Sequence, residues 1–279
     1  MPRTLILVPG HGGQPKLLLS GPGGSRAELY LHGGQVTSWV PPDGRERLFL
    51  SDLAAFAPGR AIRGGVPVIF PQVAGEGPLP KHGFARTLPW QAKEAKEGHA
   101  HLHLTDSDLT RALWPHAFEA ELIVTLEEHS LTIALAITNP GRDAIHFTAA
   151  LHPYLRVEDI TRVSLSGLQG LRLQDIAQGD TERTEMEPEI HFGNEVERLY
   201  FNAPQHLQLR EGTRITELES TGFPDILLWN PGSIAGDKLR DLEPEGYRRM
   251  ICVEAAAWVK PITLAPGERW EGSQTLIAT

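Results

Sequence analysis

Alternation of apolar and polar side chains is the feature that most limits how this 279-residue chain can fold. Between Phe118 and Leu126 every second residue is apolar, and the pattern resumes from Leu131 to Ile137 after the polar break 128–130. Side chains on a strand point alternately to the two faces of a sheet, so each run predicts a strand with one buried face. Two such runs across a short break predict an antiparallel hairpin.

Further strand candidates recur along the chain, for example at 4–8 and 46–50, and turn residues separate most of them. Only Asp108 to Trp114 is typical of a helix, with Ser107 as its N-cap and Pro115 as its stop. A β-rich chain without strand–helix–strand alternation indicates an all-β fold, either a large antiparallel β-sandwich or a barrel. No linker interrupts residues 1–279, so we expect a single domain.

The net charge of −9 argues against general binding to nucleic acid or to anionic membranes, because both need a basic surface. A few arginines can still form a local pocket for a small anion. The apolar run near the start, 4–8, is too short for a signal peptide core or a membrane span. Cys252 is the only cysteine, so no internal disulfide can form, and we expect a cytoplasmic location.

The segment from Arg60 to Trp90 combines cationic and polar groups with many glycines and prolines. It contains Arg63, Gln72, His82 and Arg86 in a stretch that is unsuited to an ordinary helix or a central strand. Loops held on a rigid scaffold commonly carry binding groups, so this segment is a candidate binding region.

His152 ends a run in which one strand face is apolar and the other is small or polar. Phe147, Ala149 and Leu151 share the face that predicts a core, whereas His152 belongs to the opposite face. Pro153 restricts His152 to extended backbone, which limits how the imidazole leaves the strand end. A surface histidine at the end of a strand is an equally open interpretation.

Glu254 stands in an apolar run, on the same strand face as Cys252. A buried carboxylate is costly unless it is paired or its pKa rises, and a well-placed glutamate is what a general base requires. The alternative is a salt bridge to Arg248 or Arg249. A lone cysteine in a strand is more often a small core residue than a nucleophile, so we expect Cys252→Ala to keep most activity.

Two histidine groupings also permit a metal interpretation. His99, His101 and His103 line one face of a single predicted strand, although a solvated face explains them more simply. A site made of His82, His152 and Glu254 would match a two-histidine, one-carboxylate pattern. Phosphate-binding glycine loops and the serine nucleophile elbow are absent from the sequence.

Taken together, these segments resemble the aldose 1-epimerase superfamily and, within it, the hexose-6-phosphate mutarotases, also called glucose-6-phosphate 1-epimerases. The pieces that carry the resemblance span most of the chain. They are Arg63-Gly64-Gly65-Val66-Pro67, Phe70-Pro71-Gln72, His82-Gly83-Phe84-Ala85-Arg86, residues 147–152, residues 225–231 and residues 250–254.

The resemblance implies a galactose mutarotase-like β-sandwich that interconverts the α and β anomers of a hexose 6-phosphate without a cofactor. It implies that Glu254 takes the proton of the anomeric oxygen O1 and that His152 protonates the ring oxygen O5. We expect the sugar to lie between these two groups.

The resemblance also assigns the binding residues. It implies that His82 bonds the sugar and that Arg63 and Arg86 pair with the phosphate, because a guanidinium binds two oxygens at once. Three further residues complete the substrate contacts that the resemblance implies. They are Gln72, Glu197 and Asp225.

Two departures from the family pattern concern Glu197, where an aspartate is common, and Pro153, where a less constrained residue is expected. The small-molecule substrate would be the only required partner, and we expect a monomer. Two alternatives remain at this point: a mutarotase of non-phosphorylated aldoses, and a non-catalytic carbohydrate-binding module on the same scaffold.

Overall fold

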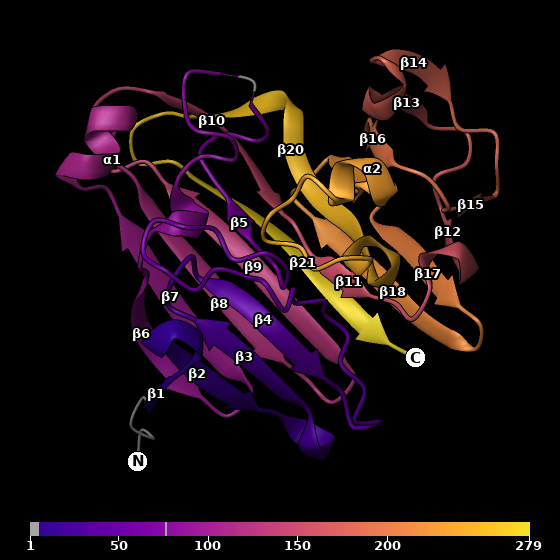
Figure 1. Ribbon diagram of the computed structural model, residues 1–279. Helices are drawn as coiled ribbons and strands as arrows, with labels where there is room; N and C mark the ends of the chain where they lie inside the picture. Colours follow the sequence, from indigo (N-terminus) through magenta and orange to yellow (C-terminus); the bar gives the residue numbers. More distant parts are fainter. Residues whose placement is uncertain (1–5, 76) are drawn as a thin grey trace.

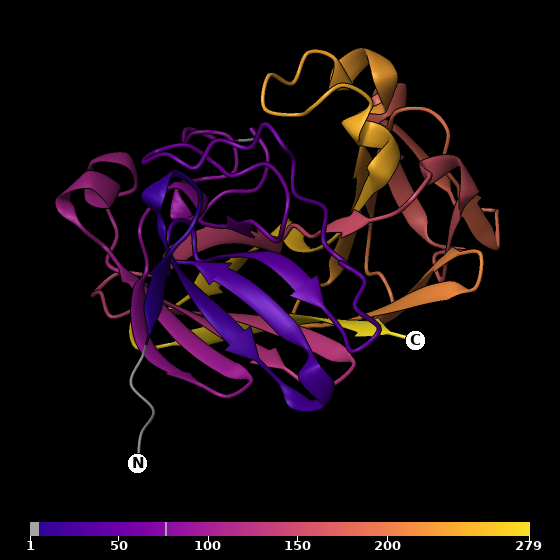
Figure 2. The same ribbon diagram turned by 60° about the horizontal axis from the view of Figure 1, so that its bottom comes forward.

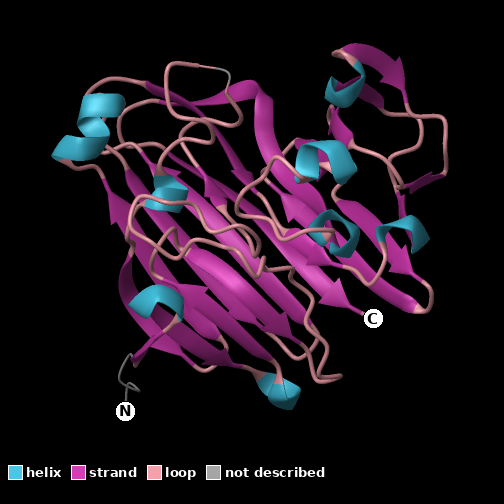
Figure 3. Cartoon of the chain, in the orientation of Figure 1, coloured by secondary structure: helices cyan, strands magenta, loops and turns pink. Residues whose placement is uncertain are grey.

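The computed structural model describes residues 6–75 and 77–279, which are organised mainly as strands in three sheets (Figures 1 and 3). The four-stranded sheet has the order β1 (Leu7–Pro9), β2 (Pro15–Ser20), β3 (Arg26–Tyr30) and β4 (Gln35–Val40). The eight-stranded sheet has the order β14 (Thr181–Thr184), β13 (Arg172–Asp175), β16 (Val196–Tyr200), β19 (Asp225–Asn230), β20 (Met250–Leu264), β10 (Ile145–Leu151) and β5 (Val68–Ile69), with β11 (Tyr154–Arg156) also paired to β20.

The nine-stranded sheet has the order β15 (Glu189–His191), β12 (Val163–Ser166), β17 (His206–Glu211), β18 (Arg214–Thr221), β21 (Arg269–Ala278), β9 (Ser130–Thr138), β8 (Glu119–Leu126), β7 (His99–Thr105) and β6 (Gln91–Lys96). The helices are α1 (Asp108–Leu113) and α2 (Gly232–Gly236). Short 3₁₀ turns are η1 (His11–Gly13), η2 (Pro22–Gly24), η3 (Ala85–Thr87), η4 (Ile160–Arg162), η5 (Ile176–Gln178) and η6 (Gly246–Arg249).

The core lies between the sheets, and strand parity decides which side chains enter it. Ile251, Val253 and Ala255 of β20 belong to the main apolar cluster, together with Leu122 of β8 and Leu276 of β21. The alternate residues of β20 face the other way. The all-β, antiparallel sandwich that the sequence predicts is therefore confirmed.

The strongest local predictions are also confirmed. β8 and β9 form the expected hairpin, with Leu126 opposite Leu131. Helix α1 begins after Ser107, whose side chain accepts from the backbone N–H of Thr110.

Three features differ from the sequence-based expectation or lie outside it. Residues 46–50 contribute isolated bridges but no named strand, the start of the predicted strand 4–8 lies outside the described residues, and α2 was not predicted.

The segment from Arg60 to Trp90 runs as loops apart from β5 and η3, as its glycine and proline content predicts. These loops lie on the same side of the sheets as the α2 connection, which is the segment 231–249 between β19 and β20 (Figure 2). Gly65 has a φ of 60°, and a Cβ there would lie 2.2 Å from the carbonyl oxygen of Val36, so only glycine fits this close approach. In the described part of the chain, no helix is long and apolar enough to cross a membrane.

Candidate active site

Strand register brings His152 and Glu254 together. Leu151 of β10 pairs with Ala255 of β20, and Tyr154 of β11 pairs with Cys252 in the same register. Continuing this register places His152 directly opposite Glu254 and on the same sheet face. The backbone N–H of His152 donates to the carbonyl of Pro67, which ties this position to the Arg-Gly-Gly-Val-Pro loop.

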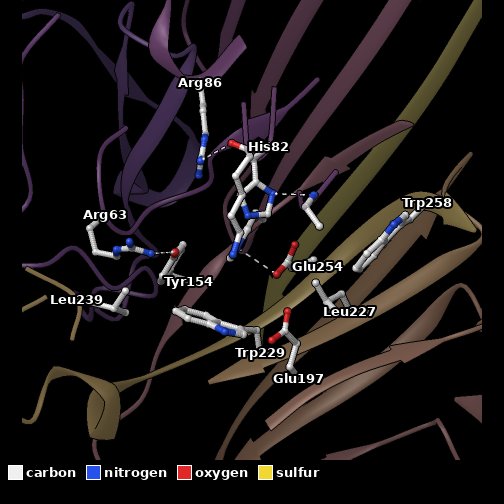
Figure 4. A pocket seen from close by; sticks show the side chains of 13 residues that line it. Arg63, His82, Arg86, Tyr154, Glu197, Leu227, Trp229, Leu239, Glu254 and Trp258 are labelled. Carbon is white, nitrogen blue, oxygen red and sulfur yellow. Dashed lines mark hydrogen bonds and ion pairs between the residues drawn. The ribbon is translucent and has the colours of Figure 1, made fainter. Parts of the chain in front are cut away.

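A cavity of about 240 Å³ opens over this pair (Figure 4). Its walls come from the eight-stranded sheet and from the loops that connect its strands. The lining residues are Arg63, Ala74, Lys81, His82, Arg86, His152, Tyr154, Glu197, Leu227, Trp229, Leu239, Glu254 and Trp258. Arg63 and Arg86 lie on one side of Glu254, and Trp258 lies on the other.

His152 and Glu254 are in direct contact. His152 Nε2 lies 3.1 Å from Glu254 Oε1, and the side chains are only 8% and 1% exposed. The distance suits an ion pair, but the contact does not have hydrogen-bond geometry, because both Glu254 oxygens and His152 Nδ1 have no hydrogen-bond partner among the described residues. Both groups therefore retain bonding capacity for hydroxyl groups of a ligand.

Burial shifts both ionisations toward the neutral forms. It raises the pKa of Glu254 well above the usual range, and the charge of Glu197 adds to this shift. It lowers the pKa of His152 well below the usual range, and the charges of His82, Arg86 and Arg63 act in the same direction. A pair with a neutral carboxylic acid and a neutral imidazole is therefore favoured over one in which both groups are charged.

His82 is held in a fixed orientation at the cavity wall. Its φ of 67° is left-handed, and its Nδ1 accepts from the backbone N–H of Ala74 at 3.2 Å. This bond assigns the ring proton to Nε2, so a neutral His82 is a donor. Burial, followed by the charges of Arg86, Lys81 and Arg63, lowers the pKa of His82 to about 3.

The cavity cations differ in how they are paired. Arg63 donates to Asp241 through Nε at 3.2 Å and Nη2 at 3.1 Å, and to the Tyr154 hydroxyl through Nη1 at 2.8 Å. Arg86 donates from Nη2 to the carbonyl of Lys81, while its buried Nε has no hydrogen-bond partner among the described residues. Among residues 6–75 and 77–279, no ion pair is found for Arg86 or Lys81. These two cations provide the less compensated positive charge.

Gln72 and Asp225, two of the predicted sugar contacts, form hydrogen bonds with the backbone in this structure. Neither Gln72 nor Asp225 lines the cavity. The Gln72 amide donates to the carbonyls of Ala74 and Leu79 and accepts from the N–H of Leu79, so it holds the following loop. A direct contact of Gln72 or Asp225 with a sugar stays a prediction, and the bonds of the Gln72 amide in this structure go to the backbone of its own loop.

The carboxylate of Asp225 accepts from the backbone N–H groups of Trp258 and Val259, at 3.1 and 3.0 Å. This contact lies where the pairing of β20 with β10 shifts register. Asp225 therefore supports the backbone of Trp258, a cavity residue, and does not itself reach the cavity.

The expectation that a sugar lies between His152 and Glu254 is also wrong, because their contact leaves no space for a ring. Two side chains 3.1 Å apart instead suit two oxygens that are bonded to one carbon, such as O1 and O5.

Several cavity residues were not predicted. Lys81 directly precedes the His-Gly-Phe-Ala-Arg motif, and Tyr154 follows His152 by two residues, so it shares the same strand face. Both positions were therefore within reach of sequence reasoning. Trp229, Trp258 and Leu239 required the tertiary structure, because their patterns are those of ordinary apolar residues.

The structure bears on the salt-bridge interpretation of Glu254 and on the metal interpretation of the histidines. Arg248 pairs with Glu245 and Arg249 pairs with Glu243, so neither neutralises Glu254. No group of three or more His, Cys, Asp or Glu side chains has metal-holding geometry in the described part of the chain. Cys252 is buried, and burial raises the pKa of its thiol, which disfavours a thiolate nucleophile.

The fold and the site together define a β-sandwich carbohydrate isomerase of the mutarotase type. The family model described as aldose 1-epimerase matches residues 15–276, so the chain belongs to the aldose 1-epimerase family. This confirms the resemblance that the sequence motifs carry.

Individual relatives agree with this assignment. A protein of Cenchrus ciliaris named "Putative glucose-6-phosphate 1-epimerase" is 37% identical over 286 residues, which cover 98% of this chain and 87% of the relative. A protein of the same name from Escherichia coli (strain K12) is 35% identical over 243 residues, covering 83% and 79%. The crystal structure of "a putative mutarotase (YeaD)" from Salmonella typhimurium has a TM-score of 0.87 at 27% identity, covering 99% and 97% of the two chains.

Proposed function

We propose that this protein interconverts the α and β anomers of a hexose 6-phosphate, with glucose 6-phosphate as the reference substrate. The observation that carries the proposal is the buried His152–Glu254 contact at the floor of a cavity that also contains Arg86 and Lys81. The names of the relatives from Cenchrus ciliaris and Escherichia coli agree with this substrate.

In the proposed reaction, Glu254 takes the proton from O1 while His152 donates its proton to O5. The C1–O5 bond breaks, and the O1 electron pair forms the carbonyl of an open-chain aldehyde. After rotation about C1–C2, both transfers reverse and the ring closes on the other face of C1. This step begins from the charged form of the pair, with Glu254 as a carboxylate and His152 as an imidazolium. The open-chain state leaves a protonated Glu254 and a neutral His152, which is the combination that burial favours. Each proton carrier contributes on the order of 10²–10⁴-fold.

The remaining cavity residues are proposed to orient the sugar. His82 would donate from Nε2 to a sugar oxygen, and Glu197 would accept from a hydroxyl. Trp229 and Trp258 supply flat apolar walls, which suit the C–H faces of a pyranose.

The phosphate is proposed to bind at Arg86 and Lys81, with Arg63 contributing its remaining N–H groups. Arg86 and Lys81 are the preferred phosphate ligands, because Asp241 already neutralises the charge of Arg63. The single cysteine supports a cytoplasmic location.

The substrate assignment is tested by measuring kcat/KM for glucose 6-phosphate and for glucose. We expect Arg86→Ala and Arg63→Ala to lower the ratio of the two values, with the larger effect for Arg86→Ala, by roughly 10–100-fold for loss of a charged contact. An unchanged ratio would assign the protein to non-phosphorylated aldoses. A wild-type protein that binds sugar without accelerating anomerisation would instead be a carbohydrate-binding module.

A further inference from the structure

A continuous series of contacts connects the α2 connection with His152. Asp241 accepts two hydrogen bonds from Arg63, and Arg63 donates to the hydroxyl of Tyr154 at 2.8 Å. The Tyr154 ring stacks on the His152 ring with a centroid distance of 4.8 Å and an interplanar angle of 6°. Figure 4 shows Arg63 directed at the Tyr154 hydroxyl.

The imidazole of His152 has few other constraints. Its Nδ1 has no hydrogen-bond partner among the described residues, and its Nε2 faces Glu254. The rings of His82 and Trp229 meet it at interplanar angles of 75° and 76°, so each approaches through an edge. Of the described aromatic rings, only that of Tyr154 covers a face of the imidazole in parallel, and this stack therefore sets the plane of the ring.

Tyr154 in turn depends on Arg63 for the position of its ring. The Tyr154 side chain is buried, and Arg63 donates a hydrogen bond to its hydroxyl. Asp241 fixes the guanidinium through two of its nitrogens, which leaves Nη1 directed at the hydroxyl. A change at Asp241 thus reaches His152 through defined contacts and without touching the sugar.

We propose that Tyr154 is a positioning residue for His152 and that Arg63 and Asp241 hold Tyr154 in place. This inference rests on the proposed role of His152 as the proton donor to O5. It gives Arg63 a task that does not depend on the phosphate. The catalytic step therefore responds to Asp241 equally for phosphorylated and non-phosphorylated sugars.

The variants Asp241→Asn and Tyr154→Leu test this inference. We expect Asp241→Asn to lower kcat about 10-fold and Tyr154→Leu about 100-fold, because small misplacements of a reacting group are costly. KM should change less than about 3-fold, since the loss lies in the transition state. Tyr154→Phe, which keeps the stack and loses the hydroxyl, should fall between wild type and Tyr154→Leu.

Glu245→Gln is the matched control, because Glu245 lies in the same segment and pairs with the exposed Arg248. It removes the same charge and should leave kcat unchanged. If Asp241→Asn changes only KM for glucose 6-phosphate, Arg63 is a phosphate ligand alone and the inference is overturned. Unchanged kcat in Asp241→Asn and Tyr154→Leu overturns it as well.

A measurement without turnover separates this inference from the proposed function. The parallel stack should shift the ring protons of His152 upfield in the NMR spectrum of the wild-type protein, through the ring current of Tyr154. We expect this shift to disappear in Tyr154→Leu and to shrink in Asp241→Asn. An unchanged shift overturns the inference, whereas an inactive wild-type protein with the expected shifts overturns the proposed function alone.

Discussion

At the scale of the residue, Glu254 combines functional value with a cost in stability. Its carboxylate is almost fully buried, and neither oxygen has a hydrogen-bond partner among the described residues. A group that is this poorly compensated resists ionisation, which makes it a strong base when it is ionised. The same property destabilises the folded state wherever the carboxylate must be charged.

Replacement of Glu254 by glutamine should therefore separate stability from activity. Its raised pKa means that the folded state binds a proton that the unfolded state loses above about 4.5, so stability falls as pH rises from that value. We expect Glu254→Gln to raise the free energy of unfolding at pH 8 by about 1–3 kcal/mol and to have less effect at pH 5. Urea unfolding at both pH values measures this.

Glu182→Gln is the control, since Glu182 forms an exposed pair with Arg172. It should change the free energy of unfolding little at either pH. A Glu254→Gln protein that is less stable than wild type at pH 8 would contradict the account of an uncompensated carboxylate.

The pKa of His82 predicts the opposite pH dependence. Because this pKa is about 3 in the folded protein and ordinarily 6.5 in an unfolded chain, the unfolded state binds more protons between these values. Stability should therefore decrease as pH falls from about 6.5 toward 3, by about 2–4 kcal/mol after allowance for partial exposure. The charges that face His82 and oppose its protonation are Arg86, Lys81, Arg63 and, when protonated, His152.

His82→Asn removes this ionisation while keeping a side chain that tolerates the left-handed backbone. The unfolding free energy of this variant should depend less steeply on pH between 6.5 and 4. His191→Gln, at an exposed site, is the control and should leave the slope unchanged. Equal slopes for wild type and His82→Asn would show that His82 titrates normally.

At the scale of the element, the loop after β5 is organised by one buried amide. Gln72 forms three hydrogen bonds with the backbone of Ala74 and Leu79. Gly77 packs directly on this amide, since a Cβ there would lie 2.3 Å from Gln72 Oε1. The loop ends in Lys81 and His82, so Gln72 acts on the site through the position of these residues.

We expect Gln72→Ala to lower the free energy of unfolding by about 1–3 kcal/mol, because buried backbone groups lose their partners. It should also raise KM for glucose 6-phosphate more than for glucose, since Lys81 loses its fixed position. Gln169→Ala, whose amide forms an exposed bond to Met186, is the matched control and should change neither quantity. A normal KM in Gln72→Ala would show that the loop holds its shape without the amide.

The elements that could be predicted from the sequence are those with local signals. The hairpin of β8 and β9 follows from alternation, and α1 follows from its cap at Ser107 and its stop at Pro115. Helix α2 spans only Gly232–Gly236 and has no side-chain cap, so no local pattern marks it. The stretch 46–50 is a strand candidate in the sequence but forms only isolated bridges, because pairing depends on neighbours that the local sequence does not specify.

At the scale of the whole molecule, the register between paired strands determines which side chains meet in the site. Parity placed His152 on a small or polar strand face and Glu254 on the face of Cys252, and the resemblance named them as a pair. Their contact at 3.1 Å depends on the pairing of β10 and β11 with β20, which is a long-range property. The roles of Gln72 and Asp225 were missed for the same reason, since a buried amide or carboxylate can bind a ligand or a distant backbone group.

The sandwich also explains why the cavity is compact. The face of β20 that carries Glu254 is opposite the face that enters the core, and the loops of residues 60–90 and the α2 connection meet over it (Figures 1 and 2). The ion pair between Arg63 and Asp241 connects the loops of residues 60–90 with the α2 connection. The cavity therefore combines side chains from these loops, which are proposed to bind the substrate, with His152 and Glu254 from the sheet, which are proposed to transfer protons.

The most direct test of the central claim is NMR exchange between the α and β anomers of glucose 6-phosphate at equilibrium. The account predicts that catalytic amounts of wild-type protein accelerate exchange far above the buffer rate. It also predicts that Glu254→Gln and His152→Gln, each still folded, lose roughly 10²–10⁴-fold of this acceleration. Exchange at the buffer rate with wild-type protein, or undiminished exchange with both variants, would contradict the account.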